Sequence, residues 1–470
     1  MGNIEIEKIL NGKFDIFKEV NDRIWDFAEP KFQEIKSSSL QKDILLKEGF
    51  VIVENLGEIN TAFSARYGSG KPIIGILGEF DALPNLSQEA DSLEHRPIQN
   101  KKWGHGCGHN TLGAGCMEAC VAIKDYMKEK NLNGTMVYYG CPGEEGGAGK
   151  AFMAREGCFD ECDICLAWHP YSVNFGSMSS LANVRVIYNF HGVSSHAAAS
   201  PHLGRSALDA VELMNVGANY LREHTLPETR IHYAITNTGG DAPNVVQAEA
   251  EVIYAIRAPH NEEVLELLNR VNSVAKGAAM MTETTVDIRV VSAYADVLQN
   301  KTLDSLIYEK MKEVLPIKYT QEELEYAKKF KAVGDIRDIK TYENMAVKML
   351  GKDGSKLFEG PMVKGVFPPT SLKMGSTDVG DVSWNVPTSW FGVACYSLGT
   401  AAHSWQTVAQ GKSVLAHKGM YAAAQVLSLA SIELFENPRI IEEAKKDFMT
   451  AKRGVEYKSI IPTEVKAGSF

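Results

Sequence analysis

A chain of 470 residues is too long for one ordinary hydrophobic core and predicts two or three domains. Its composition, 44% hydrophobic and 23% charged, is typical of a globular protein that folds in water. The formal net charge of −10 argues against a nucleic-acid partner, which requires a basic surface, but it allows an anionic substrate bound by a local arginine.

The N-terminal segment, MGNIEIEKIL, is mixed and charged and lacks the apolar core of a signal peptide. No apolar run of about 18 residues follows it, so no membrane span is expected. The 8 cysteines are scattered through the chain, which favours reduced thiols over a disulfide framework. These features together predict a cytoplasmic protein without a membrane partner.

Continuous apolar runs predict buried strands of a mostly parallel sheet, and therefore an α/β fold. The runs occupy residues 73–77, 135–141, 164–168 and 390–395. Each run leads into polar residues at or just beyond its C-terminal end. Because ligands of open α/β sheets bind at the carboxyl ends of the strands, we expect the functional site at this edge.

Two histidines and a cysteine lie close together in the segment WGHGCGHN, residues 103–110. A helix is expected after this segment, because apolar residues recur at steps of three and four from Leu112 to Met127. Asn110 or Thr111 can cap that helix.

Residues 184–292 have a different pattern, in which alternating strands and two amphipathic helices follow in the order βαββαβ. That order is typical of a small ferredoxin-like domain. The predicted organisation is a catalytic domain formed by 1–183 and 298–470, with 184–297 inserted as a second domain. Residues 318–360 are charged, and we expect an insertion with helical stretches there.

Several side chains at the predicted sheet edge are of the type that binds metals. Thiolates and neutral imidazoles bind borderline-soft divalent ions, and Cys107 and His109 directly precede a predicted helix. Each signal is weak alone, since these two residues can belong to a glycine-rich turn, and His169 and His403 can be structural histidines. Their convergence on one edge favours a metal centre.

Adjacent carboxylates favour a catalytic site over a structural zinc site. Glu144 and Glu145 follow a strand and point in different directions, so one can hold a metal while the other takes a proton from water and passes it to a leaving nitrogen. Asp81 can orient a metal-binding imidazole. The alternatives are an acidic turn, a binding protein with a structural zinc, and Cys107 as a metal-free nucleophile.

Six segments, in this order, resemble the motifs of the M20 metallopeptidase and amidohydrolase family: GEFDALP, GHGCGHN, PGEEGG, WHP, SSHAAASPHLGRSALDA and AAHSW. The resemblance implies a site with two divalent metal ions, zinc or manganese. It implies that the ligands are Cys107, His109, Glu145, His169 and His403. It also implies that Glu144 is the general base and that Asp81 supports the metal site.

Two positions depart from the family pattern. The wider family has a ligand histidine where Glu79 stands, and the Cys-Gly-His branch also lacks that histidine, so Glu79 is left out of the ligand set. The same branch usually has aspartate where Asn110 stands, which leaves the occupancy of both metal positions open.

The resemblance extends to the inserted domain, where His196, Asn244 and Arg257 match substrate-binding positions. It implies that this domain is a lid and a dimerisation domain, which pairs with a second copy or with a homologous subunit. The implied reaction is metal-dependent hydrolysis of the amide bond of an N-acyl amino acid such as p-aminobenzoyl-glutamate. The alternative substrate is a dipeptide, including one with a basic C-terminal residue.

Overall fold

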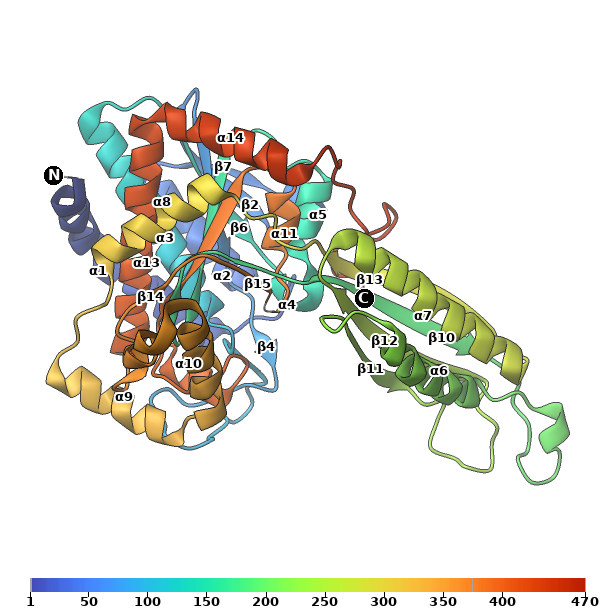
Figure 1. Cartoon of the computed structure of the whole chain (residues 1–470). Coiled ribbons are helices and arrows are strands. Elements are labelled where there is room, and N and C mark those ends of the chain that lie inside the picture. The colour runs from blue at the N-terminus through green and yellow to red at the C-terminus, as the bar shows by residue number, and fades with distance from the viewer. Residues whose placement is uncertain (1, 374, 470) are drawn as a thin grey trace. The chain divides into compact units, whose positions relative to one another are not determined.

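The computed structural model describes residues 2–373 and 375–469, which form two compact units (Figure 1). The first unit comprises the chain up to Ser179, Leu298–Leu372 and Val382–Tyr457. The second comprises Ser180–Val297 and two short segments, Lys373–Asp381 and the chain from Lys458 onward. Each unit is described by itself below.

A mainly parallel sheet forms the centre of the first unit. Its strands are β1 (Val51–Glu54), β2 (Phe63–Ser69), β3 (Ile73–Glu79), β6 (Gly134–Cys141), β7 (Ile164–Tyr171), β8 (Asn174–Phe175), β14 (Val366–Phe367) and β16 (Thr388–Ala394). They lie in the order β1-β2-β6-β3-β7-β16-β8-β14, and the central four, β6, β3, β7 and β16, run parallel. These four are the predicted apolar runs, so the prediction of a mostly parallel α/β fold is confirmed.

Long helices pack on this sheet and supply most of the core. The helices of this unit are α1 (Gly2–Phe27), α2 (Ile35–Lys47), α3 (His109–Lys130), α4 (Glu144–Gly147), α5 (Gly149–Arg155), α8 (Lys301–Val314), α9 (Gln321–Val333), α10 (Ile336–Leu350), α12 (Trp405–Gln410), α13 (Val414–Glu436) and α14 (Pro438–Lys452). α3 packs against β3, β6 and β7, and α13 packs against α3, α1 and β16. Among the described residues, no helix is long and apolar enough to cross a membrane.

Short elements complete this description. They are β4 (Leu83–Pro84), β5 (Trp103–Gly104), β9 (Met178–Ser179), β15 (Thr370–Lys373), α11 (Val379–Ser383) and the 3-10 helices η1 (Leu56–Glu58), η2 (Pro201–Leu203), η3 (Arg222–His224) and η4 (Gly351–Phe358). The charged stretch 318–360 contains α9, α10 and η4, in agreement with its predicted helical character.

The second unit has the predicted βαββαβ order. Its elements are β10 (Ala182–His191), α6 (Ala207–Leu221), β11 (Arg230–Asn237), β12 (Glu249–Ala258), α7 (Asn261–Thr282) and β13 (Thr285–Tyr294). The strands form an antiparallel sheet in the order β11-β12-β10-β13, against which α6 and α7 pack. Because the first strand lies in the middle of this sheet beside the last strand at its edge, this is the ferredoxin-like arrangement expected from the sequence.

Candidate active site and metal centre

The N-terminus of α3 places Cys107 and His109 beside the carboxyl ends of β3 and β7. Gly108 stands between them in a left-handed conformation (φ 75°), where a Cβ would collide with neighbouring side chains, so the turn requires glycine. The other histidine of the segment, His105, is buried with its Nε2 3.0 Å from the carbonyl oxygen of Ile24. It therefore packs in the core, and only His109 reaches the site.

The caps predicted for α3 are wrong. The N-cap is Gly108, and no side chain caps the helix there. The side-chain amide of Asn110 donates to Asn21 Oδ1 and to the carbonyl oxygen of Gly411, both at 2.9 Å, and the Thr111 hydroxyl also donates to Asn21 at 2.9 Å. Both residues are buried and tie α3 to α1, because partners in the core replace the local backbone as acceptors.

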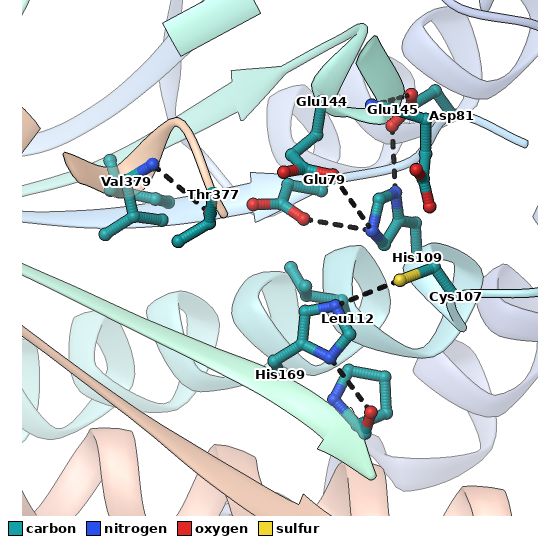
Figure 2. Close-up of polar contacts among 12 residues, drawn as sticks. Glu79, Asp81, Cys107, His109, Leu112, Glu144, Glu145, His169, Thr377 and Val379 are labelled. Atoms are coloured by element: carbon teal, nitrogen blue, oxygen red, sulfur yellow. Dashed lines mark hydrogen bonds and ion pairs between the residues drawn. The ribbon is translucent and has the colours of Figure 1, made fainter. Parts of the chain in front are cut away.

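Cys107, His109 and His169 form a first cluster of ligand-type side chains. One ligand atom from each lies within 4.8 Å of the others, and Cys107 Sγ is 3.4 Å from His169 Nε2 (Figure 2). His169 Nδ1 lies 2.9 Å from the carbonyl oxygen of Pro170, and His109 Nδ1 lies 2.9 Å from Asp81 Oδ1. These contacts engage both Nδ1 atoms and leave both Nε2 atoms for the cluster, as in metal sites whose histidines are oriented by a neighbouring acceptor.

Cys107, Glu145 and His403 form a second cluster under the same 4.8 Å limit. Glu145 Oε1 lies 3.2 Å from His403 Nε2. His403 has a left-handed backbone (φ 59°), and its amide N–H donates to the carbonyl oxygen of Gly106 at 2.8 Å. Cys107 thus belongs to both clusters, and the five ligand-type residues predicted at the sheet edge come together around its sulfur atom.

The adjacent carboxylates diverge because the short helix α4 is irregular. Glu145 has ψ 78°, outside the helical range, and its backbone N–H donates to Asp81 Oδ2 at 2.8 Å. Its side chain faces His403, whereas Glu144 Oε2 lies 3.9 Å from His109 Nε2 (Figure 2). Asp81 therefore fixes both His109 and the turn that separates the two glutamates.

Buried charges shift the titration of the first cluster. Burial alone would raise the pKa of the Cys107 thiol, but the imidazoles of His169 and His109 hold it well below its usual range. Burial opposes the charged form of His109, yet Cys107, Glu79 and Asp81 raise its pKa well above the usual value. The cluster is thus an anionic environment that holds a proton, which a divalent cation can replace.

The second cluster shows the same crowding of anionic groups. Burial, together with the nearby Cys107, raises the pKa of Glu145 to about 7. Contacts with Cys107 and Glu145 raise the pKa of His403 to about 11. Both shifts favour the species that carries an extra proton, again in place of a cation.

Three buried atoms in the centre make no well-aligned hydrogen bond among the described residues: Glu79 Oε2, His109 Nε2 and Glu145 Oε1. Glu79 and Glu145 instead make ion-pair contacts of 3.2 Å with His109 and His403. Burying polar atoms without full hydrogen bonding is costly unless another group completes their coordination. Convergent thiolate, imidazole and carboxylate atoms of this kind fit a divalent metal.

Glu34 is a functional candidate that the sequence did not reveal. It is fully buried and accepts hydrogen bonds from the backbone N–H of Phe32 at 2.8 Å and of Gly143 at 2.9 Å, directly before Glu144. Burial and the nearby Asp81 raise its pKa to about 8. Glu34 therefore positions the turn that carries the two glutamates, but 109 positions separate it from Gly143 and no motif marks it.

The α9–α10 region, within the predicted insertion, supports the segment that carries His403. The backbone N–H of Asp335, between α9 and α10, donates to the carbonyl oxygen of Gly399 at 2.8 Å. The Gln406 side chain donates to the carbonyl oxygen of Val333 at 3.2 Å. The insertion thus contacts the chain on both sides of His403.

The three predicted substrate residues lie in the second unit. His196 and Asn244 are exposed and close together, since the N–H of Ala197 donates to the Asn244 carbonyl oxygen at 3.0 Å. His196 Nδ1 accepts hydrogen bonds from Ala198 and Ala199 at 3.2 Å, which leaves Nε2 as its outward nitrogen. Arg257 lies half-buried on β12, paired in register with Asn183 and Arg230.

Comparison with known proteins defines the class. Residues 177–280 match the family model of a peptidase dimerisation domain of the M20 group. The chain is 41% identical over 458 residues to one of the subunits of p-aminobenzoyl-glutamate hydrolase from Escherichia coli (strain K12), covering 96% of this chain and 95% of that protein. It is 27% identical over 401 residues to the Xaa-Arg dipeptidase of Mus musculus, covering 83% of this chain and 78% of that protein.

Solved structures show the same fold at low sequence identity. The aminobenzoyl-glutamate utilization protein from Klebsiella pneumoniae superposes with a TM-score of 0.58 at 17% identity, covering 88% of this chain and 98% of that one. The fold and the site define a hydrolase of amide bonds with residues suited to a metal centre. The chain belongs to the M20 family of metallopeptidases and amidohydrolases, as its ordered motifs indicated.

Proposed function

We propose that this protein hydrolyses the amide bond of p-aminobenzoyl-glutamate, a breakdown product of folate, to p-aminobenzoate and glutamate. The observation that carries the proposal is the 41% identity to the E. coli p-aminobenzoyl-glutamate hydrolase polypeptide over nearly the whole of both chains. A dipeptide substrate has weaker support, because the Xaa-Arg dipeptidase is only 27% identical.

The proposed metal centre holds two divalent ions, zinc or manganese, one in each of the two clusters that share Cys107. The ligands would be Cys107, His109 and His169 for one ion and Cys107, Glu145 and His403 for the other. Divalent ions held there supply Lewis-acid activation of the amide carbonyl and of water. Either metal suits a mixed thiolate, imidazole and carboxylate set, and availability decides between them.

Glu144 is the proposed general base. It takes the proton from the attacking water and later gives it to the leaving nitrogen, so that its carboxylate is regenerated. Its side chain is near His109 but outside the two clusters that we assign to metal binding, which suits a proton carrier. Asp81 holds His109 through Nδ1 and so keeps Nε2 available as a ligand.

The second unit is proposed to recognise the substrate. Arg257 can bind a carboxylate through two parallel hydrogen bonds, and Asn244 can add an amide donor. The outward Nε2 of His196 can donate to the oxyanion that develops on the scissile carbonyl. These three groups together require a free carboxylate on the amino-acid half of the substrate, but they do not by themselves require glutamate.

We further propose a cytoplasmic protein that works as a dimer through its second unit, with either a second copy or a homologous partner protein. All 8 cysteines are free, as expected in a reducing compartment. The dimerisation-domain match supports assembly through residues 177–280. The E. coli relative is named as one subunit of its enzyme, which supports a homologous partner.

Substrate comparison should show a strong requirement for the carboxylate. Metal-reconstituted protein, assayed with and without a homologous partner, is expected to cleave p-aminobenzoyl-glutamate faster than its carboxamide or a dipeptide ending in lysine. Arg257→Met is expected to raise KM for the acid by about 10–100-fold, since charged hydrogen bonds contribute about 1.5–3 kcal/mol. Kinetics of p-aminobenzoate release measure both effects.

Arg230→Met is the matched control, because Arg230 is the exposed arginine opposite Arg257 in the β11–β12 register. It should leave KM close to the parent value. Equal rates on the acid and the carboxamide would refute the carboxylate clamp, and a preference for the lysine dipeptide would assign a dipeptidase function.

Mixing two inactive variants tests whether His196 acts on the active site of a partner chain. Glu144→Gln and His196→Ala are expected to be nearly inactive alone. In an equal mixture with free exchange, half of the dimers contain both chains and one of their two sites is intact, which should restore about one quarter of the parent activity. No recovery after mass spectrometry has verified mixed dimers would mean that His196 acts within its own chain.

A further inference from the structure

A buried ion pair lies beside the metal centre and is not explained by the residues assigned so far. Glu79 ends β3, and its Oε1 lies 2.6 Å from Nζ of Lys150 in α5. The Lys150 side chain is 0% exposed, and Glu79 is 3% exposed. Burying two charges is expensive and is often no better for stability than a well-packed apolar pair, so such a pair indicates a functional role.

The two carboxylate oxygens of Glu79 have different surroundings. Oε1 contacts Lys150, whereas Oε2 makes no well-aligned hydrogen bond and lies 3.2 Å from His109 Nε2. Glu144 Oε2 lies 3.9 Å from the same nitrogen, and Figure 2 shows both carboxylates turned toward His109. Glu79, His109 and Glu144 form a third group with ligand atoms within 4.8 Å of one another.

We propose that Glu79 is a further ligand of the metal centre, with Oε2 directed at the ion that His109 holds, and that Lys150 positions this carboxylate. A carboxylate oxygen that is fully buried and points at a ligand nitrogen needs a cation or a donor to complete it. Lys150 fixes the side chain through the other oxygen and balances its charge, so Glu79 can join the site without changing its net charge. This inference rests on the metal centre of the proposed function.

Metal binding by the full-length protein tests the inference in the absence of any substrate. Zn²⁺ and Mn²⁺ content is measured by mass spectrometry, and affinity by competition with a chelating dye. Glu79→Gln is expected to bind metal about 10–100-fold more weakly, as is Lys150→Met, because the carboxylate is lost in one and loses its orientation in the other. The melting temperature of the metal-free protein reports on folding.

The double variant Glu79→Gln/Lys150→Met separates metal binding from simple ion pairing. It leaves no lone buried charge, so its melting temperature should recover relative to the single variants, while its metal affinity should stay low. A double variant with parental affinity would show that the pair is only structural and would overturn the inference.

Glu118→Gln is the matched control, because Glu118 is a glutamate of α3 that is 0% exposed and belongs to none of the ligand groups. It should bind metal like the parent. An equal loss of affinity in Glu118→Gln would attribute the effect to any buried substitution and would also overturn the inference. A parent chain that binds neither ion would instead refute the proposed metal centre itself.

Discussion

Glu144→Gln is expected to lower kcat by about 10²–10⁴-fold, the usual contribution of general acid–base catalysis, while the fold and the metal content stay those of the parent. Glutamine has nearly the same size but cannot accept the proton of the attacking water. Glu144 lies 3.9 Å from His109 and outside the two clusters proposed to bind the ions, so its replacement should leave the ligands in place. Release of p-aminobenzoate, metal analysis and circular dichroism measure the three quantities.

Glu145→Gln is the natural comparison, because Glu145 is the neighbouring carboxylate and belongs to the cluster of Cys107 and His403. It should lose metal as well as rate. A Glu144→Gln protein with a rate close to the parent and a full metal content would assign the proton transfer to another group.

Cys107→Ala is expected to remove most of the bound metal and nearly all activity, a larger effect than that of His169→Ala or His403→Ala. The sulfur atom of Cys107 is common to both clusters, whereas each histidine belongs to one. Its low thiol pKa also makes it the anionic ligand that is most readily available near neutral pH. Metal stoichiometry of the three purified variants, measured side by side, gives the order.

Chelator treatment of the parent protein belongs to the same experiment. Activity should fall on removal of the ions and return when Zn²⁺ or Mn²⁺ is added. Activity that survives the chelator, combined with unchanged metal content in Cys107→Ala and His169→Ala, would contradict the metal centre and favour Cys107 as a nucleophile.

The electrostatics of the site explain why its residues are so tightly supported. Asp81, Glu34, Glu79 and Glu145 are buried acids within one region of the first unit, and Lys150 is a buried cation among them. Burial and neighbouring anionic groups raise the pKa values of acids in such a region, as seen for Glu34 and Glu145. Two divalent cations would relieve this repulsion, so metal binding should also raise the melting temperature.

The central strands could be predicted because their physical signal is local. A strand buried on both faces must be apolar throughout, and β3, β6, β7 and β16 coincide with the four apolar runs. The outer strands β1 and β2 escaped prediction because they are partly exposed and their sequences are mixed. The N-terminus of α3 was misjudged for a different reason: Asn110 and Thr111 have good capping chemistry, but the buried Asn21 of α1 takes their hydrogen bonds.

The sequence by itself determined the fold class, the order of the motifs and the chemical types of the site residues, since each depends on short stretches of chain. Only the tertiary structure decided how those residues share the work. It placed Cys107 in two clusters at once, turned the second oxygen of Glu79 toward His109, and brought Glu34 under the turn that carries Glu144. These relations join residues that are far apart along the chain, and their closeness in space is set by the packing of the sheet and its helices rather than by any local pattern.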